Sequence, residues 1–469
     1  MDGLEAVEIK LSGLERTNRI DSEFYRKENL IVLDVLKKTK HAPLTDSFYV
    51  SDGNHMSISD DFRQNGIRYY RGADIYNFFI EEATPVCISE EMFNRPVMKR
   101  SHLAKDDILM SIVGAIIGNI ALVRTDEKQT CSCKLAIFRP RKGVDSITAS
   151  VYLKTRYAQN QIQKFRRGAA QTGFLLEDAD QIVMPEFSDD FRKIIVKTIS
   201  KMNEIMQKAT TAYSNAESRL IASLGMENFT PSNEPVAVKT FAESFGASGR
   251  LDAEYYQQKY KDMLVRLSGF RCKRLGSIVF IKKSIEPGSD YYGDDGVPFV
   301  RVSNITKFDI QEPEIKIPAN LTDLRPKKDT ILLSKDGSVG IAYKVENDLD
   351  YITSGALLHL TIKQDVLPDY LSIVLNSMVV QLQAERDAGG SVIQHWKPSE
   401  IEEVVIPILD VDVQQQIAAD VQKSFDLRHQ SERLLDVAKR AVEIAIEDSE
   451  KAAMVWLERS TINNEVGYD

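Results

Sequence analysis

The side chains in this sequence that could do chemistry are hydrogen-bonding and cationic groups at the ends of strand-like runs. Arginine can bind guanine through two hydrogen bonds, and asparagine or glutamine can bind adenine in the same way. Two matched segments offer such groups, Arg68-Tyr-Tyr-Arg71 and Arg301-Val-Ser-Asn304. An arginine at the end of a strand can also form a surface ion pair, and the sequence leaves both interpretations open.

Glycine-containing loops present a second set of polar groups. Lys335-Asp-Gly-Ser338 is polar, whereas the matching segment Ile112-Val-Gly-Ala115 is apolar. Gly389-Gly-Ser-Val-Ile-Gln-His-Trp-Lys397 gathers an amide, an imidazole, an indole and an ammonium group. Trp396 could wedge against bases, or it could anchor its loop in the core. The matching segment Arg166-Arg-Gly-Ala-Ala-Gln171 offers two cations for phosphates and one amide for adenine.

No catalytic motif accompanies these loops. The chain has no Pro-Pro dipeptide, so the Asp/Asn-Pro-Pro-aromatic loop of amino-methyltransferases is absent, and no P-loop occurs. The 6 histidines show no triad or metal-binding spacing, and no set of carboxylates and lysines indicates a metal nuclease. Cys131-Ser-Cys133 could bind a metal, but no second ligand pair stands nearby. We therefore expect a non-catalytic protein without cofactor or metal.

The elements that must position these loops occur twice along the chain. The number of residues between matched motifs changes little along the chain, as expected if insertions fall in loops. This repeat is far longer than the repeats of solenoid proteins. Four matched pairs define the repeat: Arg19–Tyr25 with Arg250–Tyr256, Gly66–Arg71 with Gly296–Arg301, Asp107–Ser111 with Thr330–Ser334, and Val183–Pro185 with Val405–Pro407.

The body of each copy is expected to mix strands and helices. Short apolar runs between Gly and Pro predict strands at Ile67–Tyr70, Ile108–Val113, Ile120–Val123, Pro298–Val302, Thr330–Leu333 and Leu357–Ile362. Helical spacing of apolar residues predicts helices at Ser22–Lys38, Ser150–Arg166, Ala253–Leu267 and Pro368–Arg386.

Each copy ends in a long helical pattern. Asp189–Leu224 would span about 54 Å, and Val411–Arg459 about 70 Å. Each could instead be two shorter helices, but neither stretch contains Gly or Pro, which favours one helix each. Paired about a pseudo-two-fold axis, the helices would run antiparallel and hold two bodies apart. Half-sites on one face of DNA lie one turn apart, about 34–36 Å, which such a rod could match.

The overall charge argues against a simple nucleic-acid binder. The formal net charge is -9 at pH 7, whereas proteins that bind DNA usually carry a basic surplus. Basic clusters nevertheless occur at Arg95–Lys105 and Lys164–Arg167, although each also fits a solvated surface. No apolar stretch approaches the roughly 20 residues of a membrane span, and the acidic start does not look like a signal peptide. The 4 scattered cysteines give no disulfide framework, so we expect a cytoplasmic protein.

The ordered motifs resemble the specificity subunit of type I restriction-modification enzymes. Each copy has a Gly-hydrophobic-x-x-x-Arg strand, then an Ile-Leu-x-Ser strand followed by paired glycines, Gly114 with Gly118 and Gly337 with Gly340. An Ile/Val-x-Pro segment then leads into the long helix. Gln414-Gln-Gln-Ile417 fits the family's helix start, and Asp190-Phe-Arg-Lys-Ile194 departs from it.

The resemblance implies an α+β fold, a tandem duplication of a mixed sheet and helix target recognition domain, with the two long helices paired as an antiparallel coiled coil. It places the domains at 1–188 and 228–410, the spacer helices at 189–227 and 411–460, and a tail at 461–469. Its partners would be double-stranded DNA, two DNA methyltransferase subunits and a restriction or translocase subunit, with no membrane. A scaffold or acidic DNA mimic on the same architecture is the competing hypothesis.

Under this interpretation the two target recognition domains each read one half of a bipartite DNA site. The expected DNA-binding residues combine the segments above with two residues of the basic cluster at Arg95–Lys105. They are Arg68, Tyr70, Arg71, Lys99, Arg100, Arg166, Arg167, Gln171, Arg301, Ser303, Asn304, Lys335, Ser338, Gln394, His395, Trp396 and Lys397.

Overall fold

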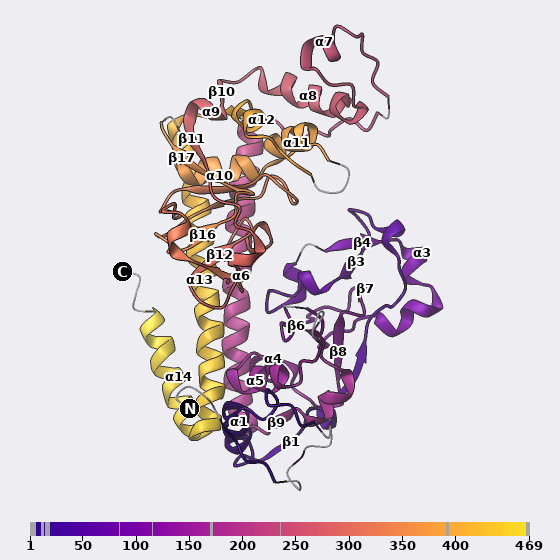
Figure 1. Ribbon diagram of the computed structural model, residues 1–469, viewed down its shortest axis with the longest axis vertical. Coiled ribbons are helices and arrows are strands. Elements are labelled where there is room, and N and C mark those ends of the chain that lie inside the picture. Colours follow the sequence, from indigo (N-terminus) through magenta and orange to yellow (C-terminus); the bar gives the residue numbers. More distant parts are fainter. Residues whose placement is uncertain are drawn as a thin grey trace. The chain divides into compact units, whose positions relative to one another are not determined.

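The computed structural model describes residues 6–10, 14, 19–83, 85–114, 116–168, 172–234, 236–364, 366–390 and 394–465. The chain forms two compact units (Figure 1). Unit 1 consists of Met1–Glu204 with Gln430–Asp469, and unit 2 consists of Ile205–His429. The two longest helices, α6 (Asp189–Ser223) and α13 (Val411–Glu447), each contribute residues to both units.

Unit 1 is built on three small sheets. The four-stranded antiparallel sheet has the order β2 (Phe48–Asp52), β8 (Leu135–Pro140), β5 (Ile108–Ser111), β6 (Ile120–Leu122). The three-stranded sheet has the order β4 (Val86–Ile88), β3 (Ile67–Tyr70), β7 (Gln129–Cys131), with β3 and β7 parallel. The two-stranded sheet pairs β1 (His41–Pro43) with β9 (Val183–Pro185). The helices are α1 (Lys27–Leu36), α2 (Leu44–Ser47), α3 (Glu90–Phe93), α4 (Ser146–Leu153), α5 (Arg156–Lys164) and α14 (Glu450–Glu465).

Unit 2 has three sheets with the same strand orders. They are β11 (Val279–Lys283), β17 (Leu357–Ile362), β14 (Ile331–Ser334), β15 (Ala342–Lys344); then β13 (Lys316–Ile317), β12 (Val297–Val300), β16 (Ile352–Thr353); then β10 (Cys272–Arg274), β18 (Val405–Pro407). The helices are α7 (Phe245–Ser248), α8 (Gln258–Leu267), α9 (Leu275–Ile278), α10 (Pro368–Asn376), α11 (Met378–Asp387) and α12 (Pro398–Glu402). The fold is therefore mixed α+β, as expected.

The repeated sequence motifs have the same structural cause in both units. β5 and β14 are buried at every position, which explains their apolar Ile-Leu-x-Ser sequence. Gly66 and Gly296 stand before β3 and β12 with φ of 145° and 114°. A Cβ atom there would lie 2.4 Å from the carbonyl oxygen of Ile88 or Ile317, so only glycine fits.

Buried glutamines tie the last strand of each unit to a helix. In unit 1, Val183 N–H donates to Gln161 Oε1 at 2.8 Å, and Gln161 Nε2 donates back to the Val183 carbonyl at 3.1 Å. In unit 2, Gln383 and Val405 make the same two bonds at 2.8 and 3.0 Å. The two units therefore share their buried polar framework as well as their strand order.

Two predicted helices in the bodies are each two helices. Ser150–Arg166 corresponds to α4 and α5, and Pro368–Arg386 to α10 and α11. The breaks fall at Thr155 and Ser377, whose backbones are extended. Their hydroxyl groups donate to carbonyl oxygens three residues earlier, at 2.6 and 2.7 Å. These side-chain bonds compete with the helical ladder and end the first helix.

The long helix predicted at Asp189–Leu224 is confirmed as α6, but the one predicted at Val411–Arg459 is wrong. It ends at Glu447, and α14 begins at Glu450. The break needs neither Gly nor Pro, because Ser449 Oγ accepts the Ala452 N–H at 3.2 Å as a helix cap. Glu450 also accepts the Ser188 N–H at 2.8 Å, which binds α14 to the start of α6.

Side chains of α13 bond to α6 within each unit. In unit 2, Ser424 Oγ donates to the Ala209 carbonyl at 2.7 Å, and Arg219 Nε donates to Asp420 at 3.2 Å. In unit 1, Ser431 Oγ donates to the Met202 carbonyl at 3.1 Å. Within unit 2 the numbers rise along α6 as they fall along α13, so the helices are antiparallel there. Among the described residues, no helix is both long enough and apolar enough to cross a bilayer.

A buried histidine predicts how the stability of unit 2 depends on pH. His359 on β17 lies 2.7 Å from Thr353 Oγ1, and burial, together with the charge of Lys282, lowers its pKa from 6.5 to about 4. The unfolded chain takes up a proton near pH 6.5 and the folded one does not, so stability is full above pH 6.5 and falls toward pH 4. The loss is on the order of 3 kcal/mol at about 1.4 kcal/mol per pKa unit.

Denaturant unfolding at several pH values, followed by circular dichroism, measures this loss. His359→Gln keeps a donor for Thr353 but cannot take up the proton, so it should remove most of the slope. His41→Gln alters an exposed histidine on β1 and should leave the slope unchanged. Equal slopes in the wild type and His359→Gln would contradict the assignment.

Candidate nucleic-acid interface

Two loops that are far apart in the sequence meet in unit 2. The turn after β14 contains Lys335–Ser338, and the loop after α11 contains Gln394–Lys397. The Trp396 N–H donates to the Lys335 carbonyl at 2.8 Å, and the Gly337 N–H donates to the Gln394 carbonyl at 2.9 Å. Both segments were expected to bind DNA, and the structure brings them together into one surface.

A small charge network organises this surface. Asp336 forms an ion pair with Lys335, and His395 Nδ1 lies 2.8 Å from Asp336 Oδ1. Burial raises the pKa of Asp336, but the bonds from Lys335 and His395 outweigh it and lower the pKa below its ordinary value. Asp336 is therefore an anion that fixes both neighbours.

Two residues of this surface are not placed to contact DNA. Lys335 was expected to bind DNA, but its side chain is nearly buried against Asp336. Trp396 is fully buried, so its expected stacking on DNA is wrong and its alternative role as a loop anchor holds. Its indole N–H has no hydrogen-bond partner within the described part of the chain. Ser338, Gln394, His395 and Lys397 are exposed.

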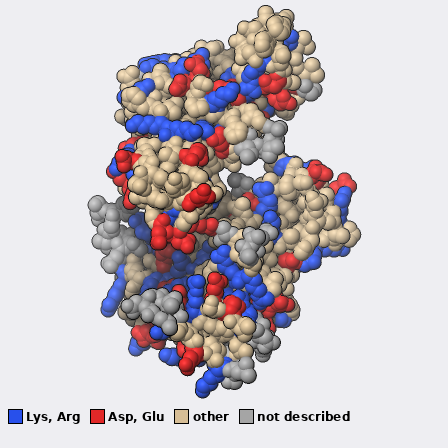
Figure 2. Space-filling view, in the orientation of Figure 1, with Lys and Arg blue, Asp and Glu red and all other residues tan. Residues whose placement is uncertain are grey.

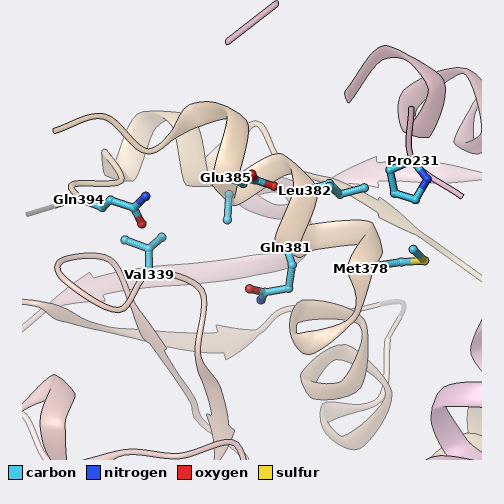
Figure 3. Close-up of a pocket in the computed structure, with 8 residues that line it drawn as sticks. Pro231, Val339, Met378, Gln381, Leu382, Glu385 and Gln394 are labelled. Carbon is cyan, nitrogen blue, oxygen red and sulfur yellow. The ribbon is translucent and has the colours of Figure 1, made fainter. Parts of the chain in front are cut away.

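A cavity lies beside this surface, entirely within unit 2. It has a volume of about 320 Å³, and Val339, Met378, Leu382 and Gln394 are among its lining residues. In Figure 3, Gln394 comes from the loop after α11 and lies close to Val339, while Gln381, Leu382 and Glu385 project from α11. Gln394 thus shares the lining of this cavity with apolar side chains from the turn after β14 and from α11.

Unit 1 brings the matching segments together in the same way. The Gly114 N–H donates to the Thr172 carbonyl and the Phe174 N–H to the Ile112 carbonyl, both at 2.9 Å. Arg166 donates to Gln163 and Thr172 at 3.1 and 3.2 Å and remains partly exposed. Gln171 lies outside the described residues.

The paired arginines differ in their surroundings. Arg167 forms an ion pair with Asp178, whose carboxylate is nearly buried, and only a third of the Arg167 side chain is exposed. Arg167 is therefore held in an ion pair, which neither the phosphate-binding interpretation nor the solvated-surface alternative expected. Arg166 makes only neutral hydrogen bonds in the described residues, so it is the better placed cation of the two.

The turns after β3 and β12 are held by their own polar residues. The Arg71 N–H donates to Asp74 Oδ2 at 2.7 Å, and the Arg301 N–H donates to Asn304 Oδ1 at 2.9 Å. Asn304 is buried, so its expected pairing with adenine is wrong: its amide oxygen caps the turn. Ser303 and the side chain of Arg71 are exposed, and Arg301 is partly exposed.

The aromatic and basic residues near β3 also divide by exposure. Tyr70 is fully buried, and burial raises its pKa to about 12, so it cannot contact DNA as expected. Arg68 is partly exposed and donates to the Glu81 carbonyl at 3.3 Å. Lys99 and Arg100 are both exposed, and Arg100 forms an ion pair with Asp52.

The sequence analysis missed a pair of exposed aromatic residues, each covered by a cation. Arg141 lies over the ring of Tyr49 at 3.9 Å in unit 1, and Lys363 lies over Phe280 at 4.6 Å in unit 2. The sequence repeat could have indicated these pairs, because Tyr49 matches Phe280 and Arg141 matches Lys363. Only the pairing of the strands, however, brings each cation to its ring.

Charges of both signs occur on the face of the molecule drawn in Figure 2, where Lys and Arg alternate with Asp and Glu. The net charge of -9 therefore does not cover this face with acidic residues alone. Within the described ranges, no group of three His, Cys, Asp or Glu residues is arranged to hold a metal ion.

Comparison with known proteins identifies one family. Residues 268–435 match the model described as "Type I restriction modification DNA specificity domain". This region runs from the turn before β10 into α13, so it covers all the sheets of unit 2. No curated protein sequence gives a match.

Three solved structures are similar over most of the chain. The type-I restriction-modification system S subunit from M. genitalium is 13% identical, with 87% of this chain and 95% of that chain covered and a TM-score of 0.35. The HsdS subunit from Thermoanaerobacter tengcongensis is 15% identical, with 90% and 96% covered and a TM-score of 0.28. A chain from a structure of type I R-M system assembly is 14% identical, with 90% and 97% covered and a TM-score of 0.28.

The charge network around Asp336 predicts a stability effect. Asp336→Ala should leave the nearly buried Lys335 ammonium without its anion and cost roughly 1–3 kcal/mol in the unfolding of unit 2. The native carboxylate has a lowered pKa, so its contribution is present above pH 3.8 and is lost as the pH falls through the folded value. Trp396 fluorescence in a Trp456→Phe background reports the loop directly.

Lys397→Ala provides the control, because Lys397 is exposed and its ion pair with Glu400, at 3.3 Å, is a surface one. That variant should change the unfolding free energy by less than about 0.5 kcal/mol. An Asp336→Ala protein as stable as the control would show that the network does not hold the loop.

Proposed function

We propose that this chain, whose residues 268–435 match the model of the type I restriction modification DNA specificity domain, is the sequence-specific DNA-recognition subunit of a type I-like restriction-modification or related defence complex. The family match confirms the resemblance drawn from the ordered sequence motifs. In this proposal the chain is non-catalytic, and partner subunits supply the methylation and restriction chemistry.

One observation carries the proposal: the two units keep the same framework while their loop surfaces differ. The buried bonds of Gln161 with Val183 recur in Gln383 with Val405, which makes a tandem duplication the simplest account. The loop surface of unit 2 carries Gln394, His395 and Lys397, whereas the matching surface of unit 1 carries Arg166. Such a pair of modules suits a bipartite site whose halves have different sequences.

Within each module we assign exposed groups by their chemistry. Gln394, His395, Ser303 and Ser338 of unit 2 can bond to base edges, and Lys397 can bind a phosphate. In unit 1, Arg71 can pair with guanine, because its side chain is exposed and its ion pair with Asp74 is long, at 3.6 Å. Lys99 and Arg166 can bind phosphates. Arg68, Arg100, Arg167 and Arg301 would position neighbouring groups rather than read bases.

The helices α6 and α13 would set the distance between the half-sites. The bonds from Ser424 to Ala209 and from Ser431 to Met202 support an antiparallel coiled coil along the two helices. The domains would then be residues 1–188 and 228–410, and the spacers residues 189–227 and 411–447, because α13 ends at Glu447 and α14 is a separate helix from Glu450 to Glu465. The start of α6 at Asp189 supports the junction at 188/189, and the start of α13 at Val411 supports the junction at 410/411.

The partners we propose are double-stranded DNA, two DNA methyltransferase subunits and a restriction or translocase subunit. One structure similar to this chain concerns complex assembly of the type I R-M system, and that assembly is the model for ours. A scaffold or DNA mimic would bind such subunits without reading any sequence.

Replacing residues 1–188 with the same region of a relative should change one half of the methylated motif and leave the other half unchanged. The transplanted segment must keep Arg156, which forms an ion pair with Glu447 of α13 at 2.6 Å. Methylome sequencing of a host that expresses the chain with its methyltransferase reads both halves at once. A motif that changed in both halves would contradict modular recognition, and methylation without any motif would favour the scaffold.

Lengthening both helices together should widen the gap between the half-sites. One heptad inserted after Met202 and another before Ser431 preserve the bond between these residues and add about 10 Å of helix. Because base pairs rise about 3.4 Å per step, the spacer should grow by about three base pairs. An unchanged spacer in an active double insertion would show that another element sets the distance.

A further inference from the structure

The repeated motif at the start of each copy presents an exposed aliphatic side chain. Ile20 lies between Arg19 and Asp21 and is 85% exposed. Leu251 lies between Arg250 and Asp252, at the matched position of the second copy, and is 68% exposed. The DNA-recognition surfaces described above contain neither residue.

Both aliphatic residues are held in place by the same pair of charged neighbours. Arg19 bonds to the Asp21 carboxylate through Nε and Nη2 at 2.7 and 2.8 Å. Arg250 bonds to Asp252 through Nε and Nη2 at 2.9 and 2.6 Å. Two parallel bonds between a guanidinium and a carboxylate restrict the segment between them, so the central side chain is flanked by a closed ion pair in both copies.

Each arginine is in turn anchored to the body of its own unit. Arg19 Nη1 donates to the Lys164 carbonyl at the end of α5, at 3.4 Å, and its guanidinium lies 4.7 Å from the Phe24 ring. Arg250 Nη1 donates to the Asp387 carbonyl at the end of α11, at 3.0 Å, and lies 4.4 Å from the Tyr255 ring. The same construction therefore presents an aliphatic group in both units.

Other exposed aliphatic residues in this region are not shared by the two copies. The helices α1 and α8 follow the motif in the same register and have the same length. Ile31 on α1 is 55% exposed and corresponds to Asp262, and Val265 on α8 is 62% exposed and corresponds to Asp34. Exposure alone therefore does not keep an aliphatic residue in both copies.

The chemistry of Ile20 and Leu251 restricts what could bind them. An aliphatic group offers nothing to a phosphate, and among base edges it suits only the thymine methyl. Residues that read the two half-sites should differ in kind between the copies, whereas these remain alike. An apolar pocket on a protein that meets both copies in the same way fits both observations.

We infer that Ile20 and Leu251 are docking residues for a second protein subunit, bound once on each copy through an apolar pocket. The inference rests on the proposed function, which supplies that subunit: a DNA methyltransferase present twice. It deepens the proposal by naming the surface that each methyltransferase uses.

The test uses the full chain co-expressed with the methyltransferase subunit of its own complex, which the proposed function expects to carry an Asn-Pro-Pro-aromatic motif. Light scattering on the purified complexes gives the number of methyltransferase subunits per chain. The wild type should bind two, Ile20→Asp and Leu251→Asp one each, and the double variant none. The milder Ile20→Ala and Leu251→Ala should weaken their own site about tenfold to hundredfold, the cost of removing a buried aliphatic side chain.

The repeat provides matched controls. Ile31→Asp and Val265→Asp add the same charge on neighbouring exposed positions, and each aspartate is the residue that the other copy carries there. Both controls should still bind two methyltransferases. A double variant, Ile20→Asp with Leu251→Asp, that also bound two would overturn the inference.

A separate DNA-binding measurement distinguishes a failure of this inference from a failure of the proposed function. The chain without methyltransferase is titrated with an unmethylated duplex that carries the target motif. The wild type and the double variant should bind this duplex with the same affinity. Weaker DNA binding with two methyltransferases still bound would assign both residues to thymine and overturn the docking role. A wild-type complex that methylates no bipartite motif would defeat the proposed function, whatever the subunit count.

Discussion

A buried side-chain amide connects the parts of each unit that recognition depends on. Gln161 lies on α5, just before the loop that carries Arg166, and it binds both backbone groups of Val183, just before α6 begins. Gln383 binds Val405 in the same way, between the loop of His395 and the start of α13. An amide buried without these partners would cost about 1–3 kcal/mol, so the position of the loop and the entry into the long helix are fixed together.

Local pattern and internal repetition were enough to predict most of the fold. Ile67–Tyr70 and Leu357–Ile362 are strands at the predicted residues, because short, largely apolar runs bounded by Gly or Pro have few other solutions. The helix at Asp189–Ser223 follows from its periodicity. Three helix breaks that the pattern did not predict involve a single hydroxyl: Thr155, Ser377 and Ser449 each end or start a helix by bonding to the backbone. The helices predicted at Ser22–Lys38 and Ala253–Leu267 are shorter than expected and run from Lys27 to Leu36 and from Gln258 to Leu267.

The candidate site was harder to predict than the fold, because burial depends on partners distant in sequence. Tyr70, Asn304 and Trp396 have side chains suited to bases, and all three face inward. Nothing near Lys335 in the sequence indicates that its partner Asp336 will also bind His395. That contact forms only when the turn after β14 and the loop after α11 are brought together by the fold. The loops themselves were identified correctly, because glycine and polar residues mark them. Which atoms of a loop face outward is a tertiary property.

The turns after β3 and β12 are closed by the same kind of hydrogen bond, from the backbone N–H of an arginine, but the acceptor differs. A carboxylate oxygen of Asp74 accepts the Arg71 N–H in one unit, and an amide oxygen of Asn304 accepts the Arg301 N–H in the other. Codons for aspartate and asparagine differ by one nucleotide, so a single mutation can add or remove a negative charge beside the arginine while the backbone bond persists. Each module can thus evolve its electrostatic potential separately, by small steps that leave its folding intact.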